Sequence, residues 1–166
     1  MNLKILILGG GIAGISAAEE IRKNSEKASI TIVSAEKHLP YYRLNLSRYL
    51  AKEIDKESLS IYPENWYKEN AIKLIQGQAA IEINKEGKWI KLEDNTKLAY
   101  DKLIITMGAH AFLPPISGNN LKNVVTVRKV EDVDQILREV NKSESCVCIG
   151  GGILGLEVAG AIAKME

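Results

Sequence analysis

Short apolar runs separated by glycine-rich and charged stretches dominate the first part of the chain. Residues 3–8 are apolar apart from Lys4, a pattern typical of a strand that is buried on both faces of a sheet. Residues 15–23 place alanine and isoleucine on one side and mostly charged residues on the other, which predicts a helix. Residues 30–33 are rich in β-branched side chains and predict a second strand, ending near Glu36. We therefore expect a β-α-β unit with parallel strands and a right-handed crossover.

The middle of the chain predicts shorter elements. Helices are expected at about residues 46–51 and directly after Pro63, because proline is tolerated in the first turn of a helix. Strands are expected at residues 72–75, 79–83, 89–92 and 103–106. The segment containing Pro114, Pro115 and Gly118 is typical of a linker between domains.

After this linker, the pattern predicts a strand, a helix and a second strand. Residues 124–127 and 146–149 are apolar and predict strands, the second of them buried. Between them, Val130, Val133, Leu137 and Val140 recur at helical spacing.

Composition narrows the classes of partner and compartment. The 22 basic residues nearly cancel the 21 acidic ones and are scattered, so we expect neither a nucleic acid nor an anionic membrane as partner. No apolar segment approaches the length of a transmembrane helix. Cys146 and Cys148 form neither a disulfide framework nor a zinc site with the distant His38 and His110. A reducing, cytoplasmic setting is the natural expectation.

The first chemistry-bearing motif is the glycine-rich segment from Gly9 to Gly14. It follows a predicted strand and opens a predicted helix, whose amino end favours an anion such as a diphosphate. In this pattern Gly9 makes the tight turn, Gly11 clears space for the diphosphate, and Gly14 lets the helix pack on the strand. Glu36, at the end of the next strand, is placed to accept the hydroxyls of a ribose and would repel a 2′-phosphate, which favours FAD or NAD. The alternative is a glycine turn that holds no ligand.

A second copy of the motif lies near the end of the chain. Gly150, Gly152 and Gly155 repeat the glycine spacing, and Glu157 follows them. The sequence ends at Glu166, within the helix that this motif opens, so no second strand or ribose-binding acid follows. We therefore expect this copy, by itself, to pack as a helix rather than to hold a nucleotide.

Taken together, the motifs resemble a known family. The two glycine motifs, with a strand between them that ends in Thr106, Met107, Gly108 and Ala109, resemble the two-dinucleotide-binding flavoproteins, or pyridine nucleotide-disulfide oxidoreductases. Residues 39–43, 46–47, 49–50 and 63–67 are similar to the branch with NADH:rubredoxin reductases and the nitrite reductase large subunit.

The resemblance implies an α/β fold. It is a Rossmann-like, three-layer FAD-binding domain with a central parallel sheet and a small antiparallel β excursion, truncated at the start of an NAD-binding domain. Residues 1–112 would be the first segment of the FAD domain, incomplete without a later return of the chain. Residues 113–166 would be the linker and the start of the NAD(P)H domain.

Site residues follow from the resemblance position by position. The FAD diphosphate would be wrapped by Gly9, Gly11, Ile12, Ala13 and Gly14. The rest of the FAD site would comprise Glu36 and Lys37 at the adenosine ribose, Arg43 near the flavin, Ala80 at the adenine through its backbone, and Thr106, Met107 and Gly108 beside the cofactor. NAD(P)H, in the full-length protein, would lie at Gly150, Gly152, Gly155 and Glu157.

One departure from the family pattern bears on activity. Disulfide-reducing members carry cysteine on the helix after the ribose acid, whereas residues 42–47 contain none, which argues against disulfide reduction. We expect no catalytic side chain and no metal ligand, because the cofactors supply the chemistry.

The resemblance implies electron transfer from NADH through flavin to a small carrier such as rubredoxin. The alternatives are the flavin module of an assimilatory nitrite reductase, with iron–sulfur and sirohaem segments downstream, and a non-enzymatic nucleotide-binding module. We expect the isolated fragment to be inactive, and its self-association is a further hypothesis.

Overall fold

The computed structural model describes residues 2–165 and divides into two compact units. The first unit runs to Tyr41 and resumes over Ser60–Gly108, and the second comprises Tyr42–Leu59 and the chain from Ala109 onward. The predicted domains, 1–112 and 113–166, remain a prediction.

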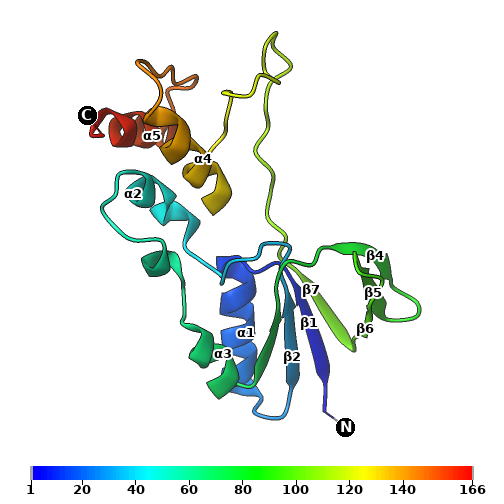
Figure 1. The fold of residues 1–166 in the computed structure, drawn as a ribbon. Coiled ribbons are helices and arrows are strands. Elements are labelled where there is room, and N and C mark those ends of the chain that lie inside the picture. The colour runs from blue at the N-terminus through cyan, green and yellow to red at the C-terminus, as the bar shows by residue number, and fades with distance from the viewer. Residues whose placement is uncertain (1, 166) are drawn as a thin grey trace. The chain divides into compact units, whose positions relative to one another are not determined.

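A four-stranded parallel sheet forms the centre of the first unit (Figure 1). Its strands are β1 (Lys4–Leu8), β2 (Ser29–Val33), β3 (Ile72–Ile75) and β7 (Lys102–Ile105), in the order β3-β2-β1-β7. Helix α1 (Ile12–Asn24) connects β1 to β2, so the predicted β-α-β unit is confirmed. Leu8 at the end of β1 lies in register with Val33 and Ile105, which places the three carboxyl ends side by side.

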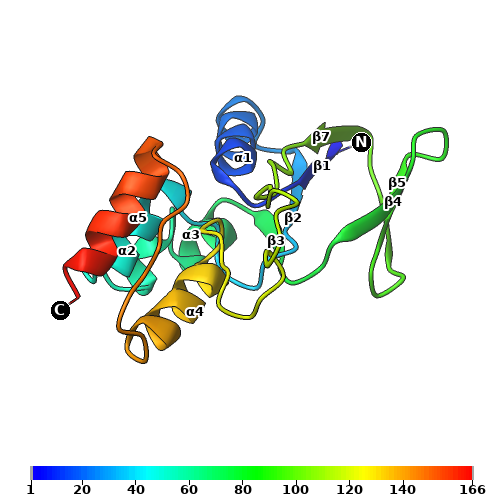
Figure 2. The same ribbon diagram turned by 90° about the horizontal axis from the view of Figure 1, so that it is seen from above.

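Alternation along β1 builds a core on each face of this sheet. Ile5 and Ile7 belong to the core that includes α1 and α3 (Glu64–Glu69), which Figure 2 shows on one side of the strands. Leu6 and Leu8 face the opposite way, into a core shared with an antiparallel sheet. That sheet consists of β4 (Ala80–Asn84), β5 (Trp89–Leu92) and β6 (Lys97–Ala99). The predicted three-layer α/β architecture with a small antiparallel sheet is confirmed.

The second unit is helical. It contains the short 3-10 turns η1 (Arg43–Asn45) and η2 (Glu57–Leu59), and the helices α2 (Leu46–Leu50), α4 (Val130–Val140) and α5 (Ile153–Ala163). Helix α2 contacts both α4 and α5. The predicted helix after the linker is confirmed, with Val130, Val133 and Ile136 as its buried face.

Two predicted strands are wrong. Residues 124–127 and 146–149 have no strand structure, and Cys146 and Cys148 are exposed rather than buried. Val147 and Ile149 are 84% and 82% exposed. A parallel strand is stable only beside hydrogen-bonded neighbours, and none runs alongside either segment within residues 2–165. The strand predicted at residues 103–106 is observed as β7 (Lys102–Ile105). It is an edge strand, because within residues 2–165 it pairs only with β1, and Ile105 is 55% exposed.

No helix within residues 2–165 has the length and apolar character needed to cross a membrane.

Candidate functional site

The first glycine turn begins directly at the carboxyl end of β1. Gly9 has φ +114°, a conformation that residues with a Cβ rarely adopt, and its N–H donates to the Val33 carbonyl at 2.8 Å. A Cβ at this position would collide with the carbonyl oxygen of Thr106. Glycine is therefore required here both by the backbone angle and by a close neighbour.

Thr106, directly after β7, holds this turn through hydrogen bonds to Leu8 and Gly9. Its N–H donates to the Leu8 carbonyl at 2.7 Å, and its Oγ1 donates to the carbonyls of Leu8 and Gly9 at 2.9 and 3.2 Å. A Cβ on Gly14 would collide with the Gly9 carbonyl and lie 2.9 Å from Thr106 Oγ1. Thr106 and Gly14 thus hold the start of α1 tightly against the end of the sheet.

The space in front of the turn is open. A Cβ built on Gly11, the N-cap of α1, would meet no heavy atom within 4 Å. No side chain caps this helix end, and its first turn, including Ile12 and Ala13, holds no acidic residue. Unsatisfied amides and the helix dipole favour an anion at such an end. The turn therefore has both the room and the donors that a diphosphate needs.

Glu36 lies in the turn that follows β2, and the structure fixes its carboxylate. The Tyr41 hydroxyl donates to Glu36 Oε2 at 2.6 Å, and Tyr41 itself is only 5% exposed. The Glu36 N–H donates to Oγ of the buried Ser34 at 3.3 Å. Sequence reasoning missed the pairing of Tyr41 with Glu36, because no spacing rule links a loop tyrosine to an acid five residues before it.

The segment after β3 also holds the turn that contains Glu36, through hydrogen bonds to its backbone. The Gly77 N–H donates to the Glu36 carbonyl at 3.0 Å, and the side-chain amide of Gln76 donates to the Lys37 carbonyl at 3.1 Å. Ala80 begins β4 shortly afterwards, is half-buried, and pairs with Leu92. These contacts connect the predicted ribose residues to the strand that carries the predicted adenine contact.

Two further predicted residues follow β7. Met107 is 61% exposed, and Gly108 adopts φ +68°, which is the left-handed region. The first unit thus contains the first glycine turn, Glu36, Lys37, Ala80 and residues 106–108.

The other predicted site residues belong to the second unit. Arg43 Nη1 donates to the Arg128 carbonyl at 2.9 Å. Gly150 adopts φ +124°, and a Cβ on Gly155 would collide with the Gly150 carbonyl, while one on Gly152 would meet nothing within 4 Å. Glu157 Oε2 accepts a hydrogen bond of 2.8 Å from the Ser47 hydroxyl.

A polar network joins α2 to α4 in this second unit. Asp134 accepts hydrogen bonds from the Tyr49 hydroxyl at 2.8 Å and from the Lys56 ammonium at 2.7 Å. Burial, together with the hydrogen bond to Asp134, raises the pKa of Tyr49 to about 12. Burial alone would raise the pKa of Asp134, but the bonds from Lys56 and Tyr49 outweigh it and lower that pKa overall.

Within residues 2–165, no three His, Cys, Asp or Glu side chains are grouped so that they could hold a metal ion.

Nearly the whole chain is similar in sequence to known bacterial reductases. The chain is 36% identical over 161 residues to the NADH-rubredoxin oxidoreductase of Clostridium acetobutylicum, covering 97% of this chain and 41% of that protein. It is 33% identical over 166 residues to the NADH nitrite reductase large subunit of Escherichia coli K12, covering 99% of this chain and 20% of that protein. The chain therefore spans less than half the length of these relatives.

Solved structures agree with this fold. The crystal structure of NADH:rubredoxin oxidoreductase from Clostridium acetobutylicum matches with a TM-score of 0.85 at 35% identity, over 99% of this chain and 42% of that one. A ferredoxin reductase from Rhodopseudomonas palustris matches with a TM-score of 0.91 at 31% identity, over 97% of this chain and 40% of that one. The family model for pyridine nucleotide-disulphide oxidoreductases matches residues 3–166, which is nearly the entire sequence. The chain belongs to the pyridine nucleotide-disulphide oxidoreductase family.

Proposed function

We propose that this chain is the FAD-binding region of an NAD(P)H-dependent reductase that passes electrons to a small carrier protein of the rubredoxin type. Members of its family are oxidoreductases that use FAD and NAD(P)H. The observation that carries the proposal is the open, uncapped amino end of α1 in front of Gly11, with Glu36 held in place in the same unit.

The proposed roles of the side chains follow from their chemistry. The amides of Gly11, Ile12 and Ala13 would donate to the FAD diphosphate, and Gly9 and Gly14 would keep the turn close enough for these contacts. Glu36 would accept the ribose hydroxyls, with Tyr41 holding its carboxylate in one rotamer. Arg43 near the flavin, and Lys37, Ala80 and residues 106–108 along the rest of the cofactor, remain part of this proposal.

The chain's part in the reaction is positioning. When bound, FAD supplies the redox chemistry, taking reducing equivalents from NAD(P)H and releasing them to the acceptor. We assign no acid, base or nucleophile to this chain. In the full-length protein, Gly150, Gly152, Gly155 and Glu157 would contribute to the NAD(P)H site.

The test uses the full-length protein that contains this chain. It should purify with visible flavin absorbance, which NADH bleaches without oxygen and which added oxidised rubredoxin restores. A colourless protein that takes up no added FAD would contradict the flavoprotein assignment. If NADH bleaches the flavin but rubredoxin is not reduced, the flavoprotein assignment stands and rubredoxin is excluded as the acceptor.

A second candidate is the flavin module of a nitrite reductase. It is favoured by the match of nearly this whole chain to the large subunit of the E. coli enzyme and to a nitrite reductase of Bacillus subtilis, at 33% and 34% identity. This candidate predicts cysteine-rich iron–sulfur and sirohaem segments in the same polypeptide and NADH oxidation that depends on nitrite. Rubredoxin reduction by a protein without such segments would exclude it.

A further inference from the structure

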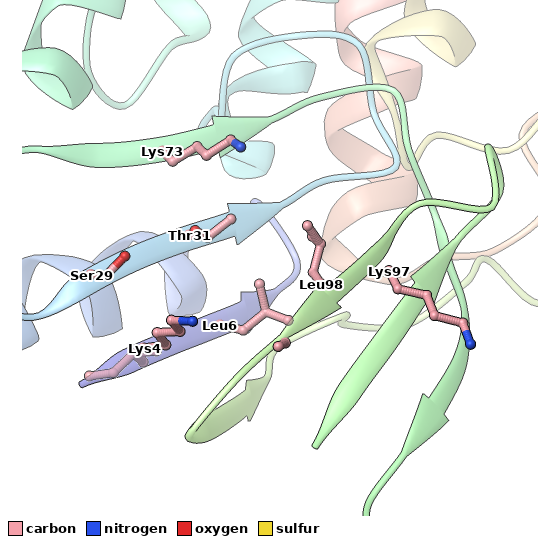
Figure 3. A pocket seen from close by; sticks show the side chains of 9 residues that line it. Lys4, Leu6, Ser29, Thr31, Lys73, Lys97 and Leu98 are labelled. Carbon is pink, nitrogen blue, oxygen red and sulfur yellow. The ribbon is translucent and has the colours of Figure 1, made fainter. Parts of the chain in front are cut away.

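A hollow of about 240 Å³ lies in the first unit, at the amino ends of the parallel strands and beside β6 (Figure 3). β1 begins here at Lys4 and runs to Leu8, so the hollow is at the opposite end of that strand from the glycine turn. Its polar lining comes from all three neighbouring strands, as Lys4, Ser29, Thr31 and Lys73.

The polar lining interrupts an otherwise apolar sheet face. Leu6, Leu8 and Val33 lie in the core beneath the antiparallel sheet, and alternation places Lys4, Thr31 and Lys73 on that same face. Lys4 is in register with Ser29, and Thr31 is in register with Lys73. These four side chains therefore form one patch on three neighbouring strands, about 10 Å across the strands and about 7 Å along them.

The open edge of β6 adds backbone donors. The Tyr100 N–H donates to the Lys88 carbonyl and the Leu92 N–H to the Thr96 carbonyl, both at 2.9 Å. Because hydrogen-bonded pairs alternate in an antiparallel ladder, the N–H and C=O groups of Lys97 and Ala99 both point away from β5, and the N–H groups are the donors at this edge. No strand within residues 2–165 pairs with that edge. The Lys97 ammonium lies 4.0 Å from the centre of the Trp89 ring, so Lys97 contributes its backbone rather than its charge.

No acidic side chain lines the hollow, and neither Lys4 nor Lys73 forms an ion pair with another described residue. Asp101 does not line the hollow, but its Oδ2 accepts the backbone N–H of Lys4 at 2.7 Å. Two ammonium groups, two hydroxyls and two edge N–H groups thus line the hollow, and no carboxylate is among the described residues that line it. Such donors bind an anion through short, charge-assisted hydrogen bonds.

We propose that this hollow binds a small phosphate-bearing anion of about the size of diphosphate. The site is separate from the glycine turn, and the proposal does not depend on the one for FAD.

The test is a titration of the ¹⁵N-labelled chain with inorganic pyrophosphate, followed by amide chemical shifts. The amides of Lys97 and Ala99 should shift saturably, and their titration is read separately from that of Gly11, which reports the glycine turn. Lys4→Gln with Lys73→Gln should weaken binding at the hollow by about tenfold or more, because two charge-assisted contacts are lost. The Gly11 titration should not change in this variant.

The matched control is Lys85→Gln with Lys122→Gln, two exposed lysines that do not line the hollow and whose loss lowers the net charge by the same amount. It should leave binding at Lys97 and Ala99 within about twofold of the unmodified chain. Thr31→Val keeps the β-branched shape, removes one hydroxyl, and should weaken binding by about threefold to tenfold. Asp101→Asn removes the nearby negative charge and should tighten it.

Three results would overturn the proposal. The Lys97 and Ala99 shifts would fail to saturate, or Thr31→Val and the double variant would bind as well as the unmodified chain, or the control pair would weaken binding as much as Lys4 and Lys73 do. Equal shifts with sulfate and pyrophosphate in all variants would indicate an adventitious ion only.

Discussion

The two glycine turns have nearly the same backbone but very different surroundings. Gly9 and Gly150 adopt φ +114° and +124°, and the last glycine of each turn packs against the carbonyl of the first. In both turns the third glycine faces open space. The glycine spacing alone is therefore sufficient to form the turn and to start the helix behind it.

The neighbours make the difference. The Gly9 N–H donates a hydrogen bond to the Val33 carbonyl, and the Gly9 carbonyl accepts one from the Thr106 hydroxyl. Gly10 packs against Ser34 and Pro40. A Cβ on Gly150 or Gly151 would meet nothing within 4 Å, and the residues before them are exposed and form no strand. A nucleotide site requires the flanking strands and the acid as well as the turn, and within residues 2–165 only the first turn has them.

The largest contrast should come from alanine at the first glycine of each turn. Gly9→Ala combines a strained φ with a collision against the Thr106 carbonyl, and should lower the free energy of unfolding of the first unit by about 3 kcal/mol or more. Gly150→Ala carries the strain without the collision and should cost about 1 kcal/mol. Urea unfolding checks the first value by tryptophan fluorescence, since both tryptophans lie in the first unit. Equal small losses would show that Thr106 does not support the turn.

The far end of α1 offers the next largest effect. The Arg22 guanidinium donates to five backbone carbonyls, those of Ser25, Glu26, Ala28, Asn70 and Ala71, at 2.6 to 3.1 Å. Arg22→Lys keeps the charge but loses the planar fork, and should destabilise the first unit by about 2 kcal/mol. The neighbouring Lys23→Arg, at an exposed position paired with Glu19, is the control and should change stability by less than about 0.5 kcal/mol.

Loss of the acidic residue near each glycine turn should change FAD affinity at the first turn but not at the second. Glu36→Gln keeps the shape but removes the charge, so FAD affinity should fall about tenfold. Tyr41→Phe should weaken it by a smaller factor, because only the orientation of the carboxylate is lost. Glu157→Gln, beside the second turn, should leave FAD affinity unchanged. Isothermal titration of FAD measures all three, and an unaltered affinity in Glu36→Gln would remove the ribose contact from the proposal.

The smallest effects belong to the network in the second unit. Asp134→Asn should lower the free energy of unfolding of that unit by about 0.5 to 1 kcal/mol at pH 7. The effect is small because the Lys56–Asp134 ion pair is partly exposed to solvent. The pKa of Asp134 is lowered by folding, so its contribution is present above 3.8 and is lost as the pH falls below that value.

Tyr49 acts at the other end of the pH range. Because folding raises its pKa from 10.0 to about 12, its contribution is complete below pH 10 and is lost as the pH rises toward 12. Hydrogen exchange of the α4 amides measures the loss of stability at both ends of the pH range, the acidic loss from Asp134 and the alkaline loss from Tyr49. Tyr49→Phe should remove the alkaline loss in α4, and an unchanged alkaline limb would show that Tyr49 does not couple α2 to α4.

Sequence patterns predicted local structure well where neighbours were not needed. The apolar run in residues 3–8, the glycine spacing and the helical repeat from Val130 are local signals, and each produced the expected element. The short strand β6 was missed, because three residues beginning with a lysine carry too little pattern.

Long-range partners could not be predicted. The sequence shows neither that residues 124–127 form no strand, nor that Tyr41 hydrogen-bonds to Glu36, nor that α2 packs with α4 and α5. The glycine motif and Glu36 were identifiable because their spacing is fixed by one β-α-β unit, whereas Ser34 and Tyr41 depend on how the loops fold back.

The central claim is that the space in front of Gly11 holds the diphosphate of FAD, and valine at the equivalent position of each turn tests it most directly. Gly11 has extended φ and ψ (−82°, 179°) and no neighbour within 4 Å, so Gly11→Val should fill that space while leaving the unfolding midpoint nearly unchanged. Gly152→Val makes the same change in the second turn, at φ −75° and ψ 169°. Titration of FAD should show affinity reduced about a hundredfold or more in Gly11→Val and unaltered in Gly152→Val. A folded Gly11→Val variant of the full-length protein that binds FAD as tightly as the unmodified full-length protein would contradict the claim.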